Sequence, residues 1–443
     1  MKNTPINYDV VKRKIEESNL SSLSKATIRE IKKLVDEIEK ETGEKYIRME
    51  MGIPGLPPSK VGVDAEIFAL KSGVASIYPD IQGIPELKKE ASRFVKLFLN
   101  IDVNEEGCIP TVGSMQGGLA AFITVNRMIE EKDTVLFLDP GFPVHKQQLG
   151  LLGQKSKSFD VYEFRGEKLR DKLESMLQKG NISAMLYSNP NNPSWICFTE
   201  EELKIIGEMA DKYEVVVLED LAYVGMDFRK DLYTPGKPPY QATAAKYTDN
   251  YILFISSSKA FSYAGQRIGM MIISDMLYNK KYPGLKKYYS SDQFGYAMIF
   301  GTIYPLSAGV THSAQHALAA IYKAANSGEF NFVDEVKEYG AKAKIMKKLF
   351  TDNGFKIVYD TDVDKPIADG FYFTFAYPGF TGEELLNELM YYGISAIALV
   401  TTGSKRTDGI RACVSLVQRE QFPDLDFRLN KFHEHHPISE KQL

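Results

Sequence analysis

Short apolar segments, each followed by a polar loop and a helical pattern, recur through the middle of the chain and limit the folds it can adopt. Four of these segments have the length of a strand and carry no charged residue: 134–138, 184–187, 215–218 and 251–255. A strand that is apolar throughout is buried on both faces, and its alternation with helices indicates parallel strands. We therefore predict an α/β fold in which a mainly parallel sheet lies between helices.

The pattern changes after Pro305, where helical patterns are followed by short segments of alternating polarity. These segments lie near residues 356–359, 370–376 and 410–416. Helices followed by such strands are typical of a smaller α+β domain, and 443 residues suffice for two domains of unequal size. We assign residues 50–310 to the large domain and residues 1–49 and 311–443 to the small domain.

Two features precede the first predicted strand of the sheet. Residues 23–41 alternate apolar and charged side chains at helical spacing, which predicts a helix with Ser24 as its cap. The segment from Met49 to Pro58 is rich in Gly and Pro and indicates a crossing between the domains. Within it, Gly52 either lets the backbone approach a ligand closely or only serves a turn.

The charge balance excludes some classes of partner. The formal net charge is -4 and no long run of one sign occurs, so we expect neither nucleic acid nor an anionic membrane surface to bind. No apolar segment approaches the length of a bilayer span, and the first ten residues lack the apolar core of a signal peptide. We predict a cytoplasmic protein that acts on a small molecule.

The cysteine and histidine residues do not predict a metal site. Three cysteines stand at positions 108, 197 and 413. Their wide separation favours reduced, buried thiols over a disulfide framework or a zinc site. His312 and His316 have no third ligand nearby in the sequence, which favours packing. The run Phe432-His-Glu-His-His436 could bind metal, but we expect a frayed polar end.

The segment from Ser256 to Gly269 lies between two apolar runs and carries Lys259 and Arg267, eight residues apart. A lysine just past a strand end, beside an arginine, can hold a phosphate next to an amine. If burial and other cations desolvate the amine, it can lose its proton and form a Schiff base. Taken alone, the same residues also suit an ordinary surface loop with a salt-bridging arginine.

Five residues follow the carboxyl ends of predicted strands: Phe142, Asn192, Asp220, Tyr223 and Lys259. In an open parallel sheet those ends share one crevice, where such folds bind ligands. Each residue alone also suits turn or capping chemistry. One shared site explains the five together better than separate coincidences do, so we predict the functional site there.

A glycine-rich turn, Gly113-Ser-Met-Gln-Gly-Gly118, joins a further predicted strand to a helix. Free N–H groups and the positive helix end suit a phosphate, and Ser114 adds a hydroxyl. The spacing matches neither the dinucleotide-binding fingerprint nor a Walker A loop, which disfavours a nucleotide enzyme.

In their order and spacing these motifs resemble those of the class I/II aminotransferases, the aspartate aminotransferase-like enzymes of pyridoxal-phosphate (PLP) fold type I. The resemblance extends from about Met49 to about Leu416. It implies pyridoxal 5'-phosphate as cofactor, a large PLP-binding domain and no metal. It also implies amino transfer from an L-amino acid to a 2-oxo acid by a ping-pong mechanism through a lysine internal aldimine.

The resemblance assigns the cofactor site residue by residue. In the motif Ser-x-Ser-Lys-x7-Arg, Lys259 matches the aldimine lysine, while Ser256 and Arg267 match phosphate ligands. The other matches are Ser114, Met115 and Gln116 for the phosphate cradle, Phe142 for ring stacking, His145 behind the aspartate, Asp220 for the pyridine nitrogen, and Asn192 and Tyr223 for the ring hydroxyl. Lys259, Asp220 and Tyr223 are thereby the predicted catalytic residues.

One further match concerns the assembly. Tyr78, in a loop similar to the family pattern Tyr-x-x-x-x-Gly-x-x-x-Leu, matches a tyrosine that reaches the phosphate of the neighbouring subunit. The resemblance therefore implies a homodimer with shared active sites.

The substrate site is implied in the same way. Arg411, in Gly409-Ile-Arg411-Ala-Cys-Val-Ser415, matches the arginine that grips the substrate α-carboxylate, and Asn192, Gly52 and Ile53 complete the site. Two segments depart from the family at the mouth of the substrate pocket: Ser194-Trp195 replaces Thr-Gly, and Gly52-Ile53-Pro54 lacks an acidic residue.

The distribution of arginines bears on the substrate side chain. No arginine lies between Ile268 and Lys405, a range in which dicarboxylate-specific members keep a second one. We therefore do not expect an aspartate-specific enzyme.

Two alternatives remain open. Fold type I C–S (β) lyases, ACC synthase-like eliminating enzymes and PLP racemases use the same lysine, aspartate and arginine, so the cofactor motifs cannot separate them from a transferase. A non-enzymatic PLP or amino-acid sensor usually carries a nucleic-acid-binding module, and this sequence shows no spare domain or basic face for one.

Overall fold

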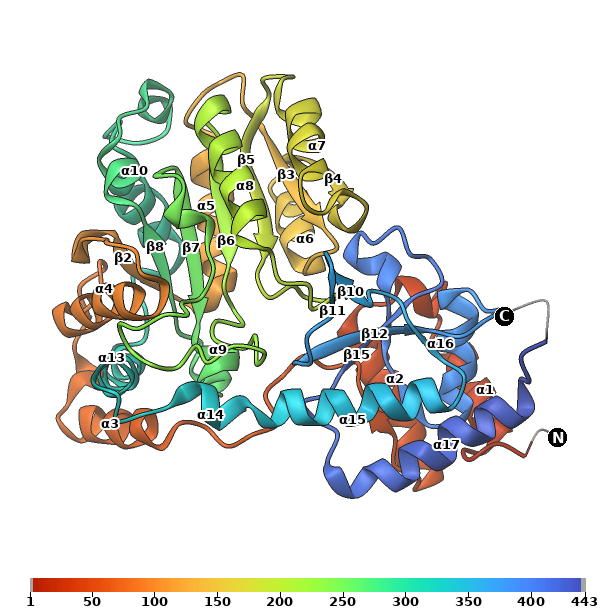
Figure 1. The fold of residues 1–443 in the computed structure, drawn as a ribbon. Coiled ribbons are helices and arrows are strands. Elements are labelled where there is room, and N and C mark those ends of the chain that lie inside the picture. The colour runs from red at the N-terminus through yellow and green to blue at the C-terminus, as the bar shows by residue number, and fades with distance from the viewer. Residues whose placement is uncertain (1–2, 440–443) are drawn as a thin grey trace.

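The computed structural model describes residues 3–439, and a seven-stranded sheet dominates it (Figure 1). The strand order is β2-β8-β7-β6-β5-β3-β4. The strands are β2 (Cys108–Thr111), β3 (Thr134–Asp139), β4 (Lys155–Asp160), β5 (Ile182–Ser188), β6 (Val216–Asp220), β7 (Tyr251–Ser256) and β8 (Gly269–Ile273). β8 is antiparallel to both neighbours and every other neighbouring pair is parallel. The predicted α/β fold is confirmed.

Helices cover both faces of this sheet. Along β3, Leu136 and Leu138 pack into one apolar cluster while Val135 and Phe137 pack into the other. The first cluster includes α4 (Pro85–Leu99), α7 (Lys168–Leu177), α8 (Glu200–Tyr213) and α13 (His312–Ser327), and the second includes α5 (Gly113–Val125), α6 (Pro143–Leu151), α10 (Asp275–Asn279), α11 (Phe294–Tyr296) and a π-helical turn over Ala297–Ile303. Because successive side chains of a strand point to opposite faces, one apolar strand fills both cores.

A second, smaller sheet has the order β14-β15-β12-β9 and is antiparallel throughout. Its strands are β9 (Lys356–Ile357), β12 (Tyr372–Ala376), β14 (Ile397–Ala398) and β15 (Ile410–Cys413), and β1 (Ile47–Arg48) pairs in parallel with β13 (Ile394–Ser395) nearby. The surrounding helices are α1 (Tyr8–Glu17), α2 (Ile28–Thr42), α15 (Glu338–Asp352), α16 (Gly382–Tyr391) and α17 (Phe422–His435). The short helix α14 (Phe332–Val336) connects the two parts, with Phe332 in the first cluster of the larger sheet and Val336 in the core of the smaller part.

The two ends of the chain share the core of this smaller part. Figure 1 shows the red N-terminal helices beside the blue C-terminal ones, and Ile31 of α2 belongs to the same apolar cluster as Leu389 and Phe432. By contrast, α13 lies within the residues assigned to the small domain but packs on the larger sheet. The domain boundaries given above stay a prediction.

Two local expectations need correction, and one strand was not predicted. The helix expected over residues 23–41 begins later, because Thr27 caps α2 in a reciprocal capping box with Glu30, whereas Leu23–Lys25 form a separate 3-10 turn. The chain end is not frayed at His433 and His435, since both lie in α17 and pair with Tyr377 and Tyr392 at 2.7 and 2.8 Å. Strand β4 was not expected, because it is a sheet edge with exposed polar side chains.

The remaining sequence expectations concern thiols, metals and membranes. The three cysteines are free and buried, as predicted. Within residues 3–439 no group of three His, Cys, Asp or Glu side chains is placed to hold a metal ion. Over the same residues no helix combines the length and the apolarity needed to cross a bilayer.

An ionic cluster joins the smaller part to the larger sheet. The hairpin of β10 (Thr361–Asp362) and β11 (Lys365–Pro366) places the buried Asp362 carboxylate 2.9 Å from both Arg165 and Arg229. Arg165 also contacts Glu202 of α8 at 2.6 Å. Since each buried charge has an opposite partner, the cluster fixes the hairpin on the larger part without leaving a charge unpaired.

Removing one charge from this cluster should destabilise the whole protein. We expect Asp362→Asn to lower the free energy of unfolding by about 3 kcal/mol, because the buried Arg165 and the partly exposed Arg229 lose a shared carboxylate. Denaturant unfolding measures the change. Asp364→Asn, on an exposed position of the same hairpin, is the control and should change stability by less than about 0.5 kcal/mol. Equal stability of the two variants would contradict the proposed clamp.

Candidate active site

The carboxyl ends of the parallel strands open into a cavity of about 950 Å³ between the two sheets. Asp220 is the last residue of β6, Ser256 is the last residue of β7, and Lys259 follows in the short helix α9 (Ser257–Ala260). The predicted site residues that line the cavity are Gly52, Ile53, Ser114, Met115, Phe142, His145, Asn192, Asp220, Tyr223, Ser256, Lys259, Arg267 and Arg411. The fold thus brings together residues that are more than 350 positions apart in the sequence.

Lys259 is held where its charged form is disfavoured. The pKa of its amine is lowered from 10.5 to about 8, chiefly by burial and also by the positive charges of Arg267 and Arg411, while Cys413 and Asp220 act in the opposite direction. The amine nitrogen also lies 5.9 Å from the ring centre of Phe371, an apolar neighbour. Near neutral pH an appreciable fraction of this amine is uncharged and available as a base or nucleophile.

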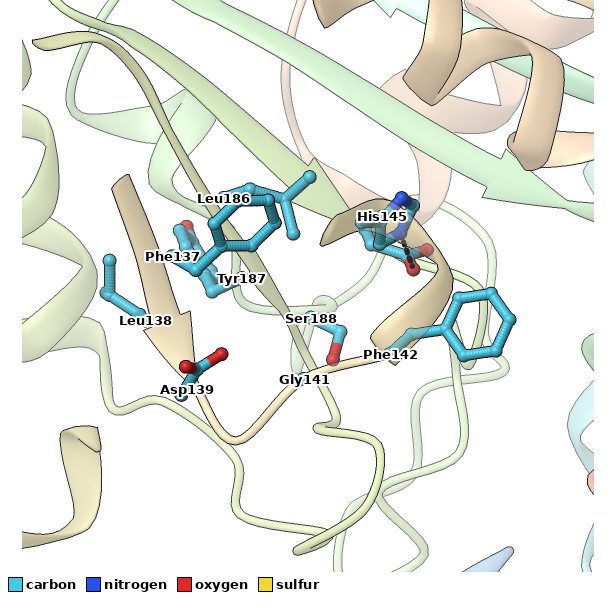
Figure 2. Close-up of a pocket in the computed structure, with 10 residues that line it drawn as sticks. Phe137, Leu138, Asp139, Gly141, Phe142, His145, Leu186, Tyr187 and Ser188 are labelled. Atoms are coloured by element: carbon cyan, nitrogen blue, oxygen red, sulfur yellow. Dashed lines mark ion pairs between the residues drawn. The ribbon is translucent and has the colours of Figure 1, made fainter. Parts of the chain in front are cut away.

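Asp220 is the carboxylate on the cavity lining. One of its oxygens accepts the backbone N–H of Ala222 at 3.0 Å, and the other lies 3.6 Å from Nε2 of the buried His145. Figure 2 shows Phe142 and His145 projecting from the start of α6, and their rings are T-shaped with centres 5.6 Å apart. A buried carboxylate with one backbone donor retains an oxygen that can bind a cationic N–H group of a ligand.

The start of α5 forms an anion cradle. Gly113 has φ +63°, and a Cβ there would lie 2.6 Å from a terminal nitrogen of Arg267, so the guanidinium sits directly over the helix start. The Ser114 hydroxyl is buried and has no hydrogen-bond partner within residues 3–439. Free helix N–H groups, a guanidinium and an unpartnered hydroxyl together suit a phosphate.

Two predicted site residues do not reach the cavity. Gln116 accepts the N–H of Val112 at 2.8 Å and donates to the Ser307 hydroxyl at 2.6 Å, which commits its side chain to the fold. Tyr78 is 89% exposed and is absent from the cavity lining. Their predicted roles in cofactor binding stay predictions.

Arg411 is a buried cation without a carboxylate. It is only 1% exposed, its Nη2 donates to the backbone carbonyl of Glu50, and its Nε has no hydrogen-bond partner among the described residues. No carboxylate of residues 3–439 lies within 4.0 Å of its nitrogens. An anionic ligand in the cavity would supply the missing charge.

Tyr372 of β12 also lines this cavity and was not singled out from the sequence. Its hydroxyl accepts the Tyr223 hydroxyl at 2.9 Å, and the guanidinium carbon of Arg411 lies 4.7 Å from its ring centre. A Cβ at Gly52 would come within 2.2 Å of the Tyr372 hydroxyl, so only glycine fits there. Burial raises the pKa of Tyr223 well above its ordinary value, so its hydroxyl stays protonated as a donor.

The Ser194-Trp195 segment, which was expected to affect the mouth of the pocket, lies beneath the site instead. Ser194 is buried and donates to Asn191, and Trp195 is fully buried and absent from the cavity lining. The Trp195 ring packs T-shaped against Tyr223 and Tyr372, with centres 5.2 and 6.1 Å away. This departure from the family pattern supports the tyrosine pair from behind.

Comparison with known proteins agrees with these features. The family model described as aminotransferase class I and II matches residues 44–383. A probable aspartate aminotransferase of Methanocaldococcus jannaschii is 26% identical over 329 residues, which cover 74% of this chain and 77% of that protein. The (5-formylfuran-3-yl)methyl phosphate transaminase of the same organism is 26% identical over 392 residues, covering 87% and 90%.

Solved structures show the same fold. The alanine aminotransferase of Pyrococcus furiosus superposes with a TM-score of 0.72 at 20% identity, covering 95% of this chain and 99% of that one. The aspartate aminotransferase of Thermus thermophilus with maleate gives 0.72 at 16% identity, covering 95% and 98%.

The depressed pKa of Lys259 predicts a pH effect on the cofactor-free protein. Between pH 8 and 10.5 the unfolded chain binds a proton that folded Lys259 has released, so the free energy of unfolding rises with pH. From pH 7.5 to 10 we expect wild type to gain about 2 kcal/mol relative to Lys259→Met, which lacks the titrating amine. Urea unfolding of both proteins at the two pH values measures this. A constant difference would show that the amine is not desolvated.

Proposed function

The chain belongs to the aminotransferase class I and II family, and from that membership we propose that its cavity binds pyridoxal 5'-phosphate and an L-amino acid, whose amino group passes to a 2-oxo acid in a ping-pong cycle. Amino transfer itself is the activity of the family. The observation that carries the proposal is the pairing of two cations in one cavity: Lys259 with a pKa of about 8, and Arg411 without a carboxylate partner.

The residues present fit the cofactor. Its phosphate would be held by the start of α5 with Ser114, by Arg267 and by Ser256, which all line the cavity. Asp220 would keep the ring nitrogen protonated, and Phe142 would stack on the ring. The carbonyl oxygen of the Asn192 side chain is buried and has no hydrogen-bond partner in the part of the chain that the structure describes, which suits a donor group of a ligand. When bound, PLP supplies an electron sink for the bonds at the substrate α-carbon.

The protein's own groups have three tasks. Arg411 binds the substrate α-carboxylate and thereby orients the α-carbon. Lys259, uncharged in part near neutral pH, accepts the α-proton and returns it at the end of the half-reaction. Tyr223, kept protonated and bonded to Tyr372, presents a fixed hydroxyl to the cavity in which Asn192 also lies.

We further propose that two copies of the chain share their active sites. Tyr78 is almost fully exposed in the single chain, and several large apolar side chains near it in sequence are exposed as well. These are Ile67, Phe68 and Leu70 of α3 (Lys60–Lys71), and Ile77. Such a cluster on a single chain favours an interface, which would explain why Tyr78 has no contact with its own cavity. A cytoplasmic location stays a prediction.

Two substitutions separate the proposed roles. We expect Lys259→Ala to abolish turnover, because the substitution removes the amine that is proposed to move the α-proton. Arg411→Ala should raise KM for the amino acid about 100-fold with a smaller effect on kcat, since a buried charge pair with the substrate is lost. Steady-state kinetics with an amino-acid panel measures both.

Arg406→Ala is the matched control for Arg411→Ala, because Arg406 pairs with Glu163 at the surface and does not line the cavity. Robust amino transfer by Lys259→Ala would refute the assignment. Release of ammonia and a 2-oxo acid from a β-substituted amino acid, with no acceptor present, would indicate a lyase instead.

The shared-site proposal predicts complementation between two defective variants. Tyr78→Ala should weaken PLP binding about tenfold, because a phosphate contact from the neighbour is lost. A dimer of one Tyr78→Ala chain and one Lys259→Ala chain has one site with both residues intact and one site with neither. Joint refolding of the two variants in equal amounts should therefore restore about a quarter of the wild-type sites. Activity after denaturation and joint refolding measures this at a PLP concentration too low to load Tyr78→Ala alone, with Tyr288→Ala as an exposed-tyrosine control. Absence of recovery would place Tyr78 outside the partner's site.

A further inference from the structure

The N-terminal segment of the chain contributes two cations that the proposed chemistry does not use. Residues 24–29 line the cavity, and among them Lys25 and Arg29 are exposed at its opening. Neither side chain takes part in an ion pair or a hydrogen bond within residues 3–439, although many other surface cations of the chain do. They are therefore free to contact a ligand.

The fold holds this segment in place. The hydroxyls of Ser22 and Ser24 donate to the two carboxylate oxygens of Glu383, at 2.6 and 3.1 Å. Directly afterwards the Thr27–Glu30 capping box starts α2, so Arg29 lies in the first helical turn. A segment tied at both ends positions its cations with a smaller loss of conformational entropy on binding than a loose one would.

The charges around the cavity are unbalanced. Its other cations are Lys259, Arg267 and Arg411, and Asp220 is the only carboxylate among the described residues that line it. The proposed function gives Lys259 the proton transfer, Arg267 the cofactor phosphate and Arg411 the α-carboxylate. Lys25 and Arg29 remain, which leaves room for one more anionic group.

The rest of the lining suits an aliphatic stem. Apolar side chains from three separate parts of the chain contribute to the wall: Met51, Ile53, Val144, Ile397 and Val400. Apolar walls favour methylene groups and repel an uncompensated charge, so an anion must lie where the cations are.

We propose that Arg29 and Lys25 form a subsite for a carboxylate at the far end of the substrate side chain. The substrates would then be acidic amino acids, with the α-carboxylate on Arg411 and the side-chain carboxylate at the N-terminal segment. This inference rests on the proposed function. It revises the expectation drawn from the absence of arginine between Ile268 and Lys405, because the second cation comes from the opposite end of the chain.

Equilibrium binding of unreactive acids to the PLP-loaded protein tests the subsite without turnover. Calorimetry would compare the dicarboxylates succinate, glutarate and adipate with butyrate, valerate and hexanoate, the monocarboxylates of equal or closest length. We expect one dicarboxylate to bind about tenfold or more tightly than its monocarboxylate partner. Arg29→Gln should reduce that preference about 5- to 50-fold and Lys25→Gln by less, while monocarboxylate binding stays unchanged.

Lys33→Gln is the matched control, since Lys33 lies on the same helix, pairs with Glu37 and does not line the cavity. The proposal is overturned if dicarboxylates and monocarboxylates bind equally, or if Arg29→Gln leaves the preference intact. Failure of the proposed function can be told apart from failure of the subsite. In the first case no amino acid would be converted, while the preference for dicarboxylates over monocarboxylates would persist.

Discussion

Positive charge gathered on the lining of one cavity is the constraint on which the rest of this structure depends. Among the described residues, Lys259, Arg267 and Arg411 share the cavity lining with a single carboxylate, Asp220. Burying charges without partners is unfavourable, so the surrounding fold must be stable enough to maintain them until anionic ligands arrive. The pKa of Lys259 is lowered chiefly by burial and in part by the neighbouring arginines, and the uncharged amine that results is the form that transamination needs.

The stability that maintains the cavity comes from the apolar cores of the larger sheet and of the smaller part, which meet around it. Lys259 and Asp220 stand on the ends of buried parallel strands, whereas Arg411 stands on the smaller sheet. The crossing segment holds Arg411 in the smaller part, because the Glu50 carbonyl accepts a hydrogen bond from Arg411 while the Glu50 carboxylate is held by Arg48 and Ser395. Arg411 is thus held by a contact that does not involve the ligand.

Much of the site could be predicted from the sequence, because strand ends are local signals. A fully apolar run followed by a polar loop marks the carboxyl end of a parallel strand, which placed Asp220, Asn192 and Lys259 on one rim. The cavity wall made by residues 24–29 gave no such signal, since its position depends on Glu383, more than 350 residues away. Tyr372 was missed because its role depends on packing against Tyr223.

Trp195 stands where the family pattern has glycine, and residues distant in the sequence accommodate the larger side chain. It has φ +63°, a conformation that favours glycine, and an indole in that place needs space inside the protein. Gly370 supplies this space, since a Cβ there would lie 1.9 Å from the Trp195 ring. The buried indole then packs against both tyrosines of the cavity, so the strained position has a compensating gain in packing. The tyrosine pair is therefore positioned from behind by a residue that never touches the cavity.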